Sequence, residues 1–89
     1  MHGRTPLGIA ARCGHVEVVS RLVAAGANVD AAGEDGETPL YMAAQNGHVE
    51  VVARLVAAGA NKDARTPSGH RPIDIARERK HDEVVRHLM

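Results

Sequence analysis

Residues 36–64 read GETPLYMAAQNGHVEVVARLVAAGANKDA, and nearly the same stretch occurs 33 residues earlier. Residues 3–31 and 36–64 are identical at 22 of 29 aligned positions, and no gap is needed. A more divergent third copy begins at Gly69. In this copy the sequence Asp82-Glu83-Val84-Val85 takes the place of Val49-Glu50-Val51-Val52. A fixed period of this size predicts a stacked array, in which each unit buries its apolar face against its neighbours.

Each unit is predicted to form two short helices and a loop. Thr38-Pro39 is typical of a helix start, because Thr can cap the helix and Pro suits its first turn. Gly47 and Gly59 are expected to end the two helices, since Gly readily adopts the left-handed conformation found there. The second helix carries one apolar stripe, formed by Val51, Val52, Leu55 and Val56. Residues 59–69 and the equivalent residues 26–36 are rich in turn-forming residues and indicate loops.

The motifs Gly-x-Thr-Pro-Leu, Ala-Ala-x-x-Gly-His-x-Glu-Val-Val and Gly-Ala-Asn-x-Asp-Ala resemble the ankyrin repeat, whose period is also 33. The resemblance covers nearly the whole chain. It implies an all-α solenoid, an ankyrin repeat stack of helix-turn-helix units with β-hairpin loops. We expect one domain over residues 1–89, divided into a first repeat (3–35), a second repeat (36–68) and a C-terminal capping half-repeat (69–89).

The resemblance also implies a function. Ankyrin repeats bind other proteins through their loop tips and through the first helix of each pair, which together line a concave face. Transferred residue by residue, the implied partner-binding positions are Arg4, Arg12, Cys13, Ala32, Glu34, Asp35, Glu37, Tyr41, Gln45, Asn46, Arg65, Pro67, Ser68, His70, Glu78 and Arg79. We therefore expect a non-catalytic protein–protein interaction module whose partner is another protein of unknown identity.

Several of these positions have two interpretations. Tyr41, the only aromatic residue, falls on a position that is usually framework, so it either packs in the core or contacts the partner. His70 is either a contact or a plain exposed residue. Every charged residue from Asp30 to Glu50 is acidic, which indicates either a solvated loop or a surface that selects a partner of complementary charge.

The sequence departs from the family pattern at three places. Gly8, Tyr41 and Asp74 stand where the family usually has His after Thr-Pro-Leu, and Gly8 should cost about 0.5–1 kcal/mol relative to Ala. The last unit has Lys80 in place of Gly and many charges around it, as a capping repeat requires. The first unit looks internal, so we expect it to leave apolar surface uncovered. A fragment of a longer array, an engineered minimal array and a self-associating chain would each explain this.

Composition excludes several classes of function. The chain has 89 residues, with 11 Lys and Arg against 11 Asp and Glu. No apolar run is long enough for a membrane helix, so we expect no membrane partner. The zero net charge and single aromatic residue oppose nucleic-acid binding, and one cysteine permits no internal disulfide. A natural chain would be cytoplasmic or nuclear, whereas for an engineered one the question of localisation has no meaning.

No chemical site is predicted. His15, His48 and His81 recur every 33 residues, but equivalent atoms of stacked helical units lie about 8–10 Å apart, too far for two ligands of one zinc ion. Cys13 is separated from His15 by the expected helix-ending Gly14, so the two form no evident nucleophile–base pair. We therefore expect no enzyme activity, no metal and no cofactor.

The alternative function is structural. A self-associating fragment or designed scaffold would pair through the uncapped face of its N-terminal repeat. Its mass would rise with concentration, and a polar residue at Leu7 or Val18 would weaken the dimer.

Overall fold

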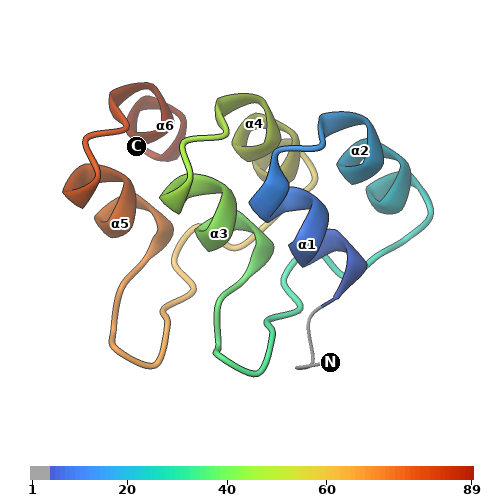
Figure 1. The fold of residues 1–89 in the computed structure, drawn as a ribbon, viewed down its shortest axis with the longest axis horizontal. Helices are drawn as coiled ribbons and strands as arrows, with labels where there is room; N and C mark the ends of the chain where they lie inside the picture. The colour runs from blue at the N-terminus through green and yellow to red at the C-terminus, as the bar shows by residue number, and fades with distance from the viewer. Residues whose placement is uncertain (1–4) are drawn as a thin grey trace.

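The chain folds into six short helices arranged in two rows, in a computed structural model that describes residues 5–89. The helices are α1 (Pro6–Cys13), α2 (Val16–Ala24), α3 (Pro39–Gln45), α4 (Val49–Ala57), α5 (Pro72–Glu78) and α6 (Asp82–Leu88). Figure 1 shows α1, α3 and α5 side by side in one row and α2, α4 and α6 in the other, with the long connections on one side of the molecule. This is the predicted stack of helix pairs.

The first helix of each pair begins with a proline and a side-chain cap, as the sequence predicts. The hydroxyl groups of Thr5 and Thr38 each accept a hydrogen bond from the amide three residues later, at 2.9 and 3.1 Å. Arg71 takes the place of this threonine in the third pair, and its side chain has no oxygen atom that could accept the capping hydrogen bond. There the Asp74 carboxylate accepts a hydrogen bond from the Arg71 amide at 2.9 Å instead.

The first helix also ends as predicted, with the chain turning through the left-handed region. Gly14 and Gly47 have φ values of 76° and 73°. Lys80 occupies the equivalent place in the third pair with φ of 62°, and it is the only non-glycine residue with positive φ among residues 5–89. The third pair therefore makes the same turn with a residue that has a side chain.

Gly8 has a steric role that the sequence did not indicate. A Cβ atom at this position would lie 3.0 Å from Cε of Met42 and 3.1 Å from the Thr5 hydroxyl oxygen. The glycine therefore allows α1 and α3 to pack closely, which offsets its low helix propensity.

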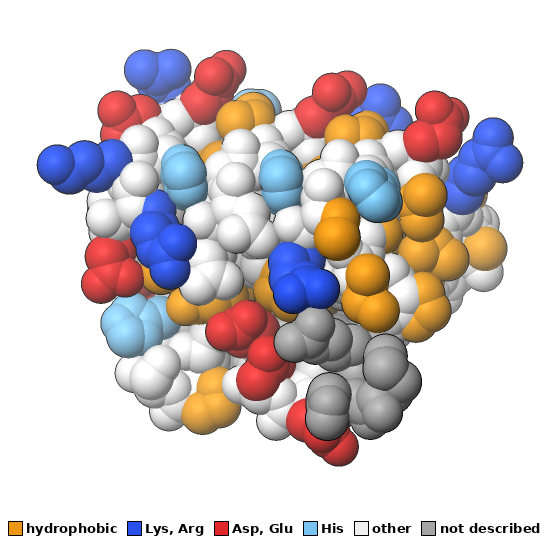
Figure 2. Space-filling view, viewed as in Figure 1, with side chains coloured by type: hydrophobic (Ala, Val, Ile, Leu, Met, Phe, Trp, Pro, Cys, Tyr) orange, Lys and Arg blue, Asp and Glu red, His pale blue; other side chains and the backbone are white. Residues whose placement is uncertain are grey.

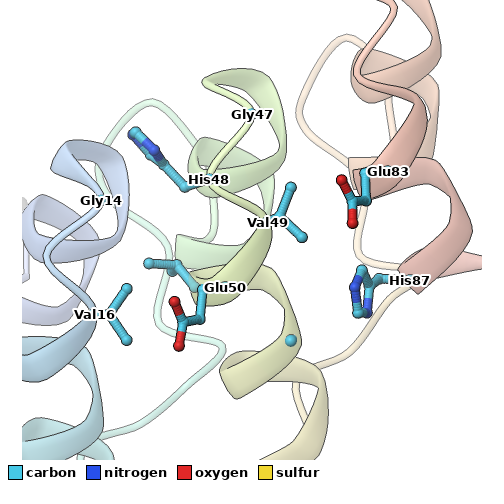
Figure 3. Close-up of a pocket in the computed structure, with 10 residues that line it drawn as sticks. Gly14, Val16, Gly47, His48, Val49, Glu50, Glu83 and His87 are labelled. Atoms are coloured by element: carbon cyan, nitrogen blue, oxygen red, sulfur yellow. The ribbon is translucent and has the colours of Figure 1, made fainter.

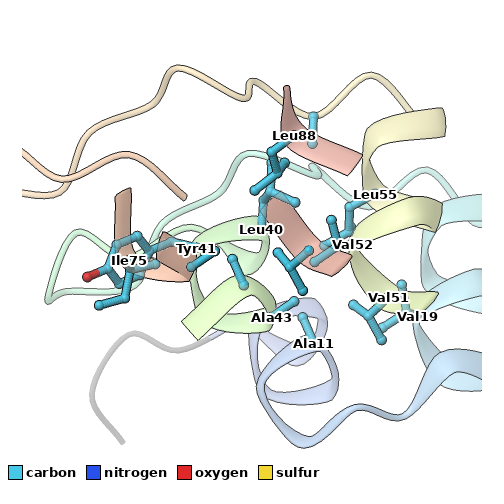
Figure 4. Packing of buried hydrophobic residues seen from close by; sticks show 14 of the residues in the cluster. Ala11, Val19, Leu40, Tyr41, Ala43, Val51, Val52, Leu55, Ile75 and Leu88 are labelled. Atoms are coloured by element: carbon cyan, nitrogen blue, oxygen red, sulfur yellow. The ribbon is translucent and has the colours of Figure 1, made fainter. Parts of the chain in front are cut away.

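The core lies between the two rows and is built almost entirely from aliphatic side chains. Leu40, Val52 and Leu55 of the central pair are completely or almost completely buried, and Figure 4 shows them packed together. Leu7 is only 2% exposed, so it belongs to this core. The expectation that Leu7 forms part of an uncovered face is therefore wrong.

The two long connections are tight turns rather than regular hairpins. The Gly36 amide donates to the Gly33 carbonyl, and the Gly69 amide donates to the Thr66 carbonyl. One further backbone bond closes each turn, from Gly33 to the Glu37 carbonyl and from Thr66 to the His70 carbonyl. No β-strand is formed between residues 5 and 89, so the expected β-hairpins are reduced to their turns.

None of the described helices has the length and apolar character that crossing a bilayer requires.

Candidate partner-binding surface

The predicted contact residues fall into two groups. One group lies in the loops that precede α3 and α5, and the other lies at the C-terminal ends of α1, α3 and α5. The loop group consists of Ala32, Glu34, Asp35, Glu37, Arg65, Pro67, Ser68 and His70. The helix-end group consists of Arg12, Cys13, Gln45, Asn46, Glu78 and Arg79. Glu37 and Gln45 are half-buried, whereas the others in these groups are exposed. Arg4 lies outside the described residues. Most of the predicted positions are therefore accessible to a partner.

The tips of the two loops touch each other. A Cβ atom at Gly36 would come within 2.5 Å of Cδ of Pro67, so the Pro67 ring lies directly against the glycine. Within the first loop, the Asp35 side chain accepts a hydrogen bond from the Glu37 amide at 3.1 Å. The two tips thus form one continuous surface, because the Pro67 ring of the second loop lies against Gly36 of the first.

Side-chain hydrogen bonds order the second loop. Thr66 is buried, and its hydroxyl group lies 3.1 Å from the Ser68 hydroxyl group and accepts a bond from the His70 amide at 3.2 Å. The Ser68 hydroxyl group also lies 3.1 Å from Nδ1 of His70. The Arg65 guanidinium group donates to the Gly69 carbonyl at 3.0 Å. These bonds give the loop an internal order that does not depend on a partner.

The helix ends are joined from one pair to the next by histidines. Nε2 of His48 donates to the Arg12 carbonyl at 2.9 Å, and Nε2 of His81 donates to the Gln45 carbonyl at 3.1 Å. The Asn46 side chain donates to the same Arg12 carbonyl at 3.0 Å. These two histidines therefore have a structural role, because each ties one helix pair to the pair before it. Sequence reasoning missed that Asn46, although exposed, also links neighbouring pairs.

Tyr41 is a core residue. Its side chain is 6% exposed and belongs to the same apolar cluster as Ile75 (Figure 4). Burial raises the pKa of its hydroxyl group above the usual value of 10.0, and the nearby carboxylates of Glu37 and Glu78 raise it further. Of the two interpretations, the structure favours core packing over partner contact.

Charges are unevenly distributed over this face. Figure 2 shows acidic side chains around the first loop, which joins α2 to α3. Basic side chains lie higher on the same face, towards the helix ends. Arg71 and Asp74 form an ion pair at 3.1 Å at the start of α5. Hydrogen bonds from the Arg71 guanidinium group and then from its backbone amide lower the pKa of Asp74 to about 2. The Asp74 carboxylate therefore caps the N-terminus of α5.

A separate open hollow of about 660 Å³ lies on the second-helix row. Figure 3 shows Glu83 and His87 of α6 on one side of it, and Val16 of α2 and Glu50 of α4 on the other. Its titratable groups are His48 and Glu50, at the start of α4, and Glu83 and His87, both on α6. Within residues 5–89, no three His, Cys, Asp or Glu side chains lie close enough together to hold a metal ion. We therefore assign no chemistry to this hollow.

The chain shares its family-wide sequence pattern with known proteins over almost its full length. The family model described as "Ankyrin repeats (3 copies)" matches residues 7–89. The chain belongs to the ankyrin repeat family. Domains of this family are generally protein-interaction modules and typically lack catalytic activity. A search of curated proteins finds no match to this ankyrin chain.

Proposed function

We propose that this ankyrin domain binds a partner protein through its two joined loop tips and the adjacent row of first helices. The division into repeats at 3–35, 36–68 and 69–89 is part of the same proposal. The observation that supports it best is the contact between Gly36 and Pro67, which makes one surface of two loops. Binding to a pre-ordered surface avoids part of the entropic cost of association.

The charge of this surface supports a proposal about the chemistry of the partner. Glu34 and Asp35 are exposed at the first loop tip, and no basic side chain forms an ion pair with either of them within residues 5–89. A partner segment that places Lys or Arg opposite this tip would be attracted to it, and the attraction would raise the association rate more than the final affinity. We therefore propose a basic protein segment as the ligand of the loop tips.

The test uses peptides selected against the immobilised 89-residue protein from a random displayed library. The expected peptides are basic, and their affinity should fall at least about tenfold when Glu34→Lys and Asp35→Lys are combined. The matched control combines Glu17→Lys with Glu83→Lys, which makes the same charge change on α2 and α6. The control should leave affinity unchanged. Equal losses in both variants, or selection of acidic peptides, would contradict the proposal.

The alternative, pairing of two copies through the N-terminal face, stays a prediction. Sedimentation of the protein over a hundredfold concentration range tests it directly. A constant monomer mass would remove it.

A further inference from the structure

Ser68 carries the only fully exposed hydroxyl side chain among residues 5–89. The other hydroxyl side chains of the chain are buried or half-buried: Thr5, Ser20, Thr38, Tyr41 and Thr66. Thr5 and Ser20, which are half-buried, also accept hydrogen bonds from within the protein, at 2.9 and 2.8 Å. An enzyme that modifies hydroxyl groups can therefore reach Ser68 without unfolding a helix.

The loop that joins α4 to α5 presents Ser68 at its tip. Figure 1 shows this loop and the loop between α2 and α3 projecting from the same side of the molecule, away from the helices. Ser68 lies in a turn that is closed by a hydrogen bond of 2.8 Å from the Gly69 amide to the Thr66 carbonyl. A projecting tip enters the cleft of another protein more readily than the surface of a packed helix does.

A positive charge stands at a fixed offset from this hydroxyl group. Arg65 lies three residues before Ser68 and is exposed. Its guanidinium group donates a hydrogen bond of 3.0 Å to the Gly69 carbonyl, so it lies in the same turn. Protein kinases select their substrates by the pattern of charges around the acceptor hydroxyl group. An arginine at this offset favours a kinase whose peptide-binding cleft is acidic.

The same loop contains groups that can bind a phosphate attached to this serine. Nδ1 of His70 and the hydroxyl group of Thr66 each lie 3.1 Å from Oγ of Ser68. The Arg65 guanidinium group is held one residue away, at the Gly69 carbonyl. A phosphate would bring three strong acceptor oxygens to this place, and hydrogen bonds between charged groups are stronger than those between neutral ones.

From these observations we propose that Ser68 is a phosphorylation site, modified by an arginine-directed protein kinase, and that Arg65 and His70 hold the phosphate. Oγ of Ser68 attacks the γ-phosphorus of the nucleoside triphosphate that the kinase binds. The new oxygen–phosphorus bond forms as the bond to the bridging oxygen breaks, so the nucleoside diphosphate leaves. The hydroxyl proton passes to a carboxylate of the kinase.

The phosphate would add to the acidic surface at the loop tips. Pro67, next to Ser68, lies against Gly36, and Gly36 follows the exposed Asp35. Phosphorylation adds a charge of about −1.5 to −2 at neutral pH. It should therefore raise the association rate of a basic segment about fivefold or more at low ionic strength. This consequence rests on the proposed function, whereas the phosphorylation site itself does not.

The first test maps the phosphate. The 89-residue protein and a synthetic peptide of residues 61–74 are incubated with ATP and a kinase that requires arginine three residues before serine, and fragment-ion mass spectrometry locates the phosphate. We expect Ser68 to be modified in the folded protein. Arg65→Ala should slow the reaction at least about tenfold. The matched control, Lys62→Ala, removes the same charge from the same loop and should not slow it. Modification of the peptide alone, of neither molecule, or of another residue in the protein would overturn the proposal.

The second test asks which groups surround the phosphate, by phosphorus-31 nuclear magnetic resonance during a pH titration. The second ionisation of an ordinary phosphoserine is centred at about pH 6. Arg65 and His70 would favour the doubly charged form, whereas Glu34, Asp35 and Glu37 of the first loop would oppose it. We expect the midpoint to be at least about half a pH unit lower in the folded protein than in urea, and to rise when Arg65→Ala and His70→Ala are combined. A midpoint equal to that in urea, or higher, would overturn the assignment of Arg65 and His70.

The third test measures the association rate of the selected basic peptides with the phosphorylated and the unmodified protein. An unchanged or lower rate after phosphorylation would overturn the expected effect on binding. Failure of this inference and failure of the proposed function are distinguishable. A lack of phosphate on Ser68 overturns the inference and leaves the binding of basic peptides as it is. Selection of acidic peptides contradicts the proposed function and leaves the mapped phosphate as it is.

Discussion

Replacing Gly47 by Ala should destabilise the protein more than the same replacement at Gly59. Both glycines have positive φ, 73° and 90°, so alanine is strained at either place. Left-handed backbone costs a residue with a side chain roughly 1–2 kcal/mol, and a less flexible unfolded chain offsets about 0.4–1 kcal/mol of this. We therefore expect the backbone contribution at each position to be about 1 kcal/mol.

The two sites differ in what the new methyl group meets. At Gly47 it would lie 2.9 Å from Cε1 and Nδ1 of His81, closer than the 3.4–4 Å of ordinary contact. At Gly59 no atom lies within 4 Å. To avoid the methyl group the His81 ring must shift and weaken its 3.1 Å hydrogen bond to the Gln45 carbonyl, which costs about 1 kcal/mol more. The expected totals are about 2 kcal/mol for Gly47→Ala and about 1 kcal/mol for Gly59→Ala.

Urea unfolding followed by far-ultraviolet circular dichroism measures both free energies. The His81→Ala background provides the control, because without the ring the two alanine substitutions should cost about the same. Equal costs in the original protein would refute the reasoning, since they would show that backbone strain alone explains the glycine. The reasoning would also be refuted if Gly47→Ala still lowered the free energy of unfolding more than Gly59→Ala in the His81→Ala background.

Four further predictions follow from single residues. Leu55→Ala should cost about 2–5 kcal/mol in urea unfolding, and Leu22→Ala clearly less, because only Leu55 is completely buried. Lys80→Gly should raise the free energy of unfolding by up to about 1 kcal/mol by relieving the left-handed strain, and a loss in the same assay would contradict this. Because the pKa of Asp74 is lowered to about 2, its stabilisation should be complete above its ordinary pKa and be lost as pH falls towards 2; Asp74→Asn should flatten that part of the pH–stability curve. Because the pKa of Tyr41 is raised, the absorbance of its phenolate should appear above pH 10 in the folded protein and at about pH 10 in urea, with stability falling as the group ionises; a midpoint at or below 10 in the folded protein would be inconsistent with a buried ring.

The local structure could be predicted because short-range chemistry decides it. Thr38-Pro39 starts a helix and Gly47 ends one, and both signals could be read from the sequence because a cap and a left-handed turn involve only neighbouring residues. The repeated motifs resemble the ankyrin repeat, and the family model confirms that resemblance over residues 7–89. The 33-residue period by itself predicts only that the units stack, because each unit buries its apolar face against its neighbours.

The residues that are shared between neighbouring units could not be predicted in the same way. Tyr41 had two possible roles in the sequence, and only its burial against the third pair distinguished them. Leu7 was expected at an open face, but it is 2% exposed and belongs to the apolar core cluster.

By itself, the sequence determined the period, the helix boundaries and the aliphatic faces of each unit. The tertiary structure decided which of the identical faces are covered, and therefore which valines are core and which are surface. Val18 and Val51 lie in the same local sequence and differ only in what precedes them in space. Burial depends on atoms that are distant along the chain, so no local pattern can specify it.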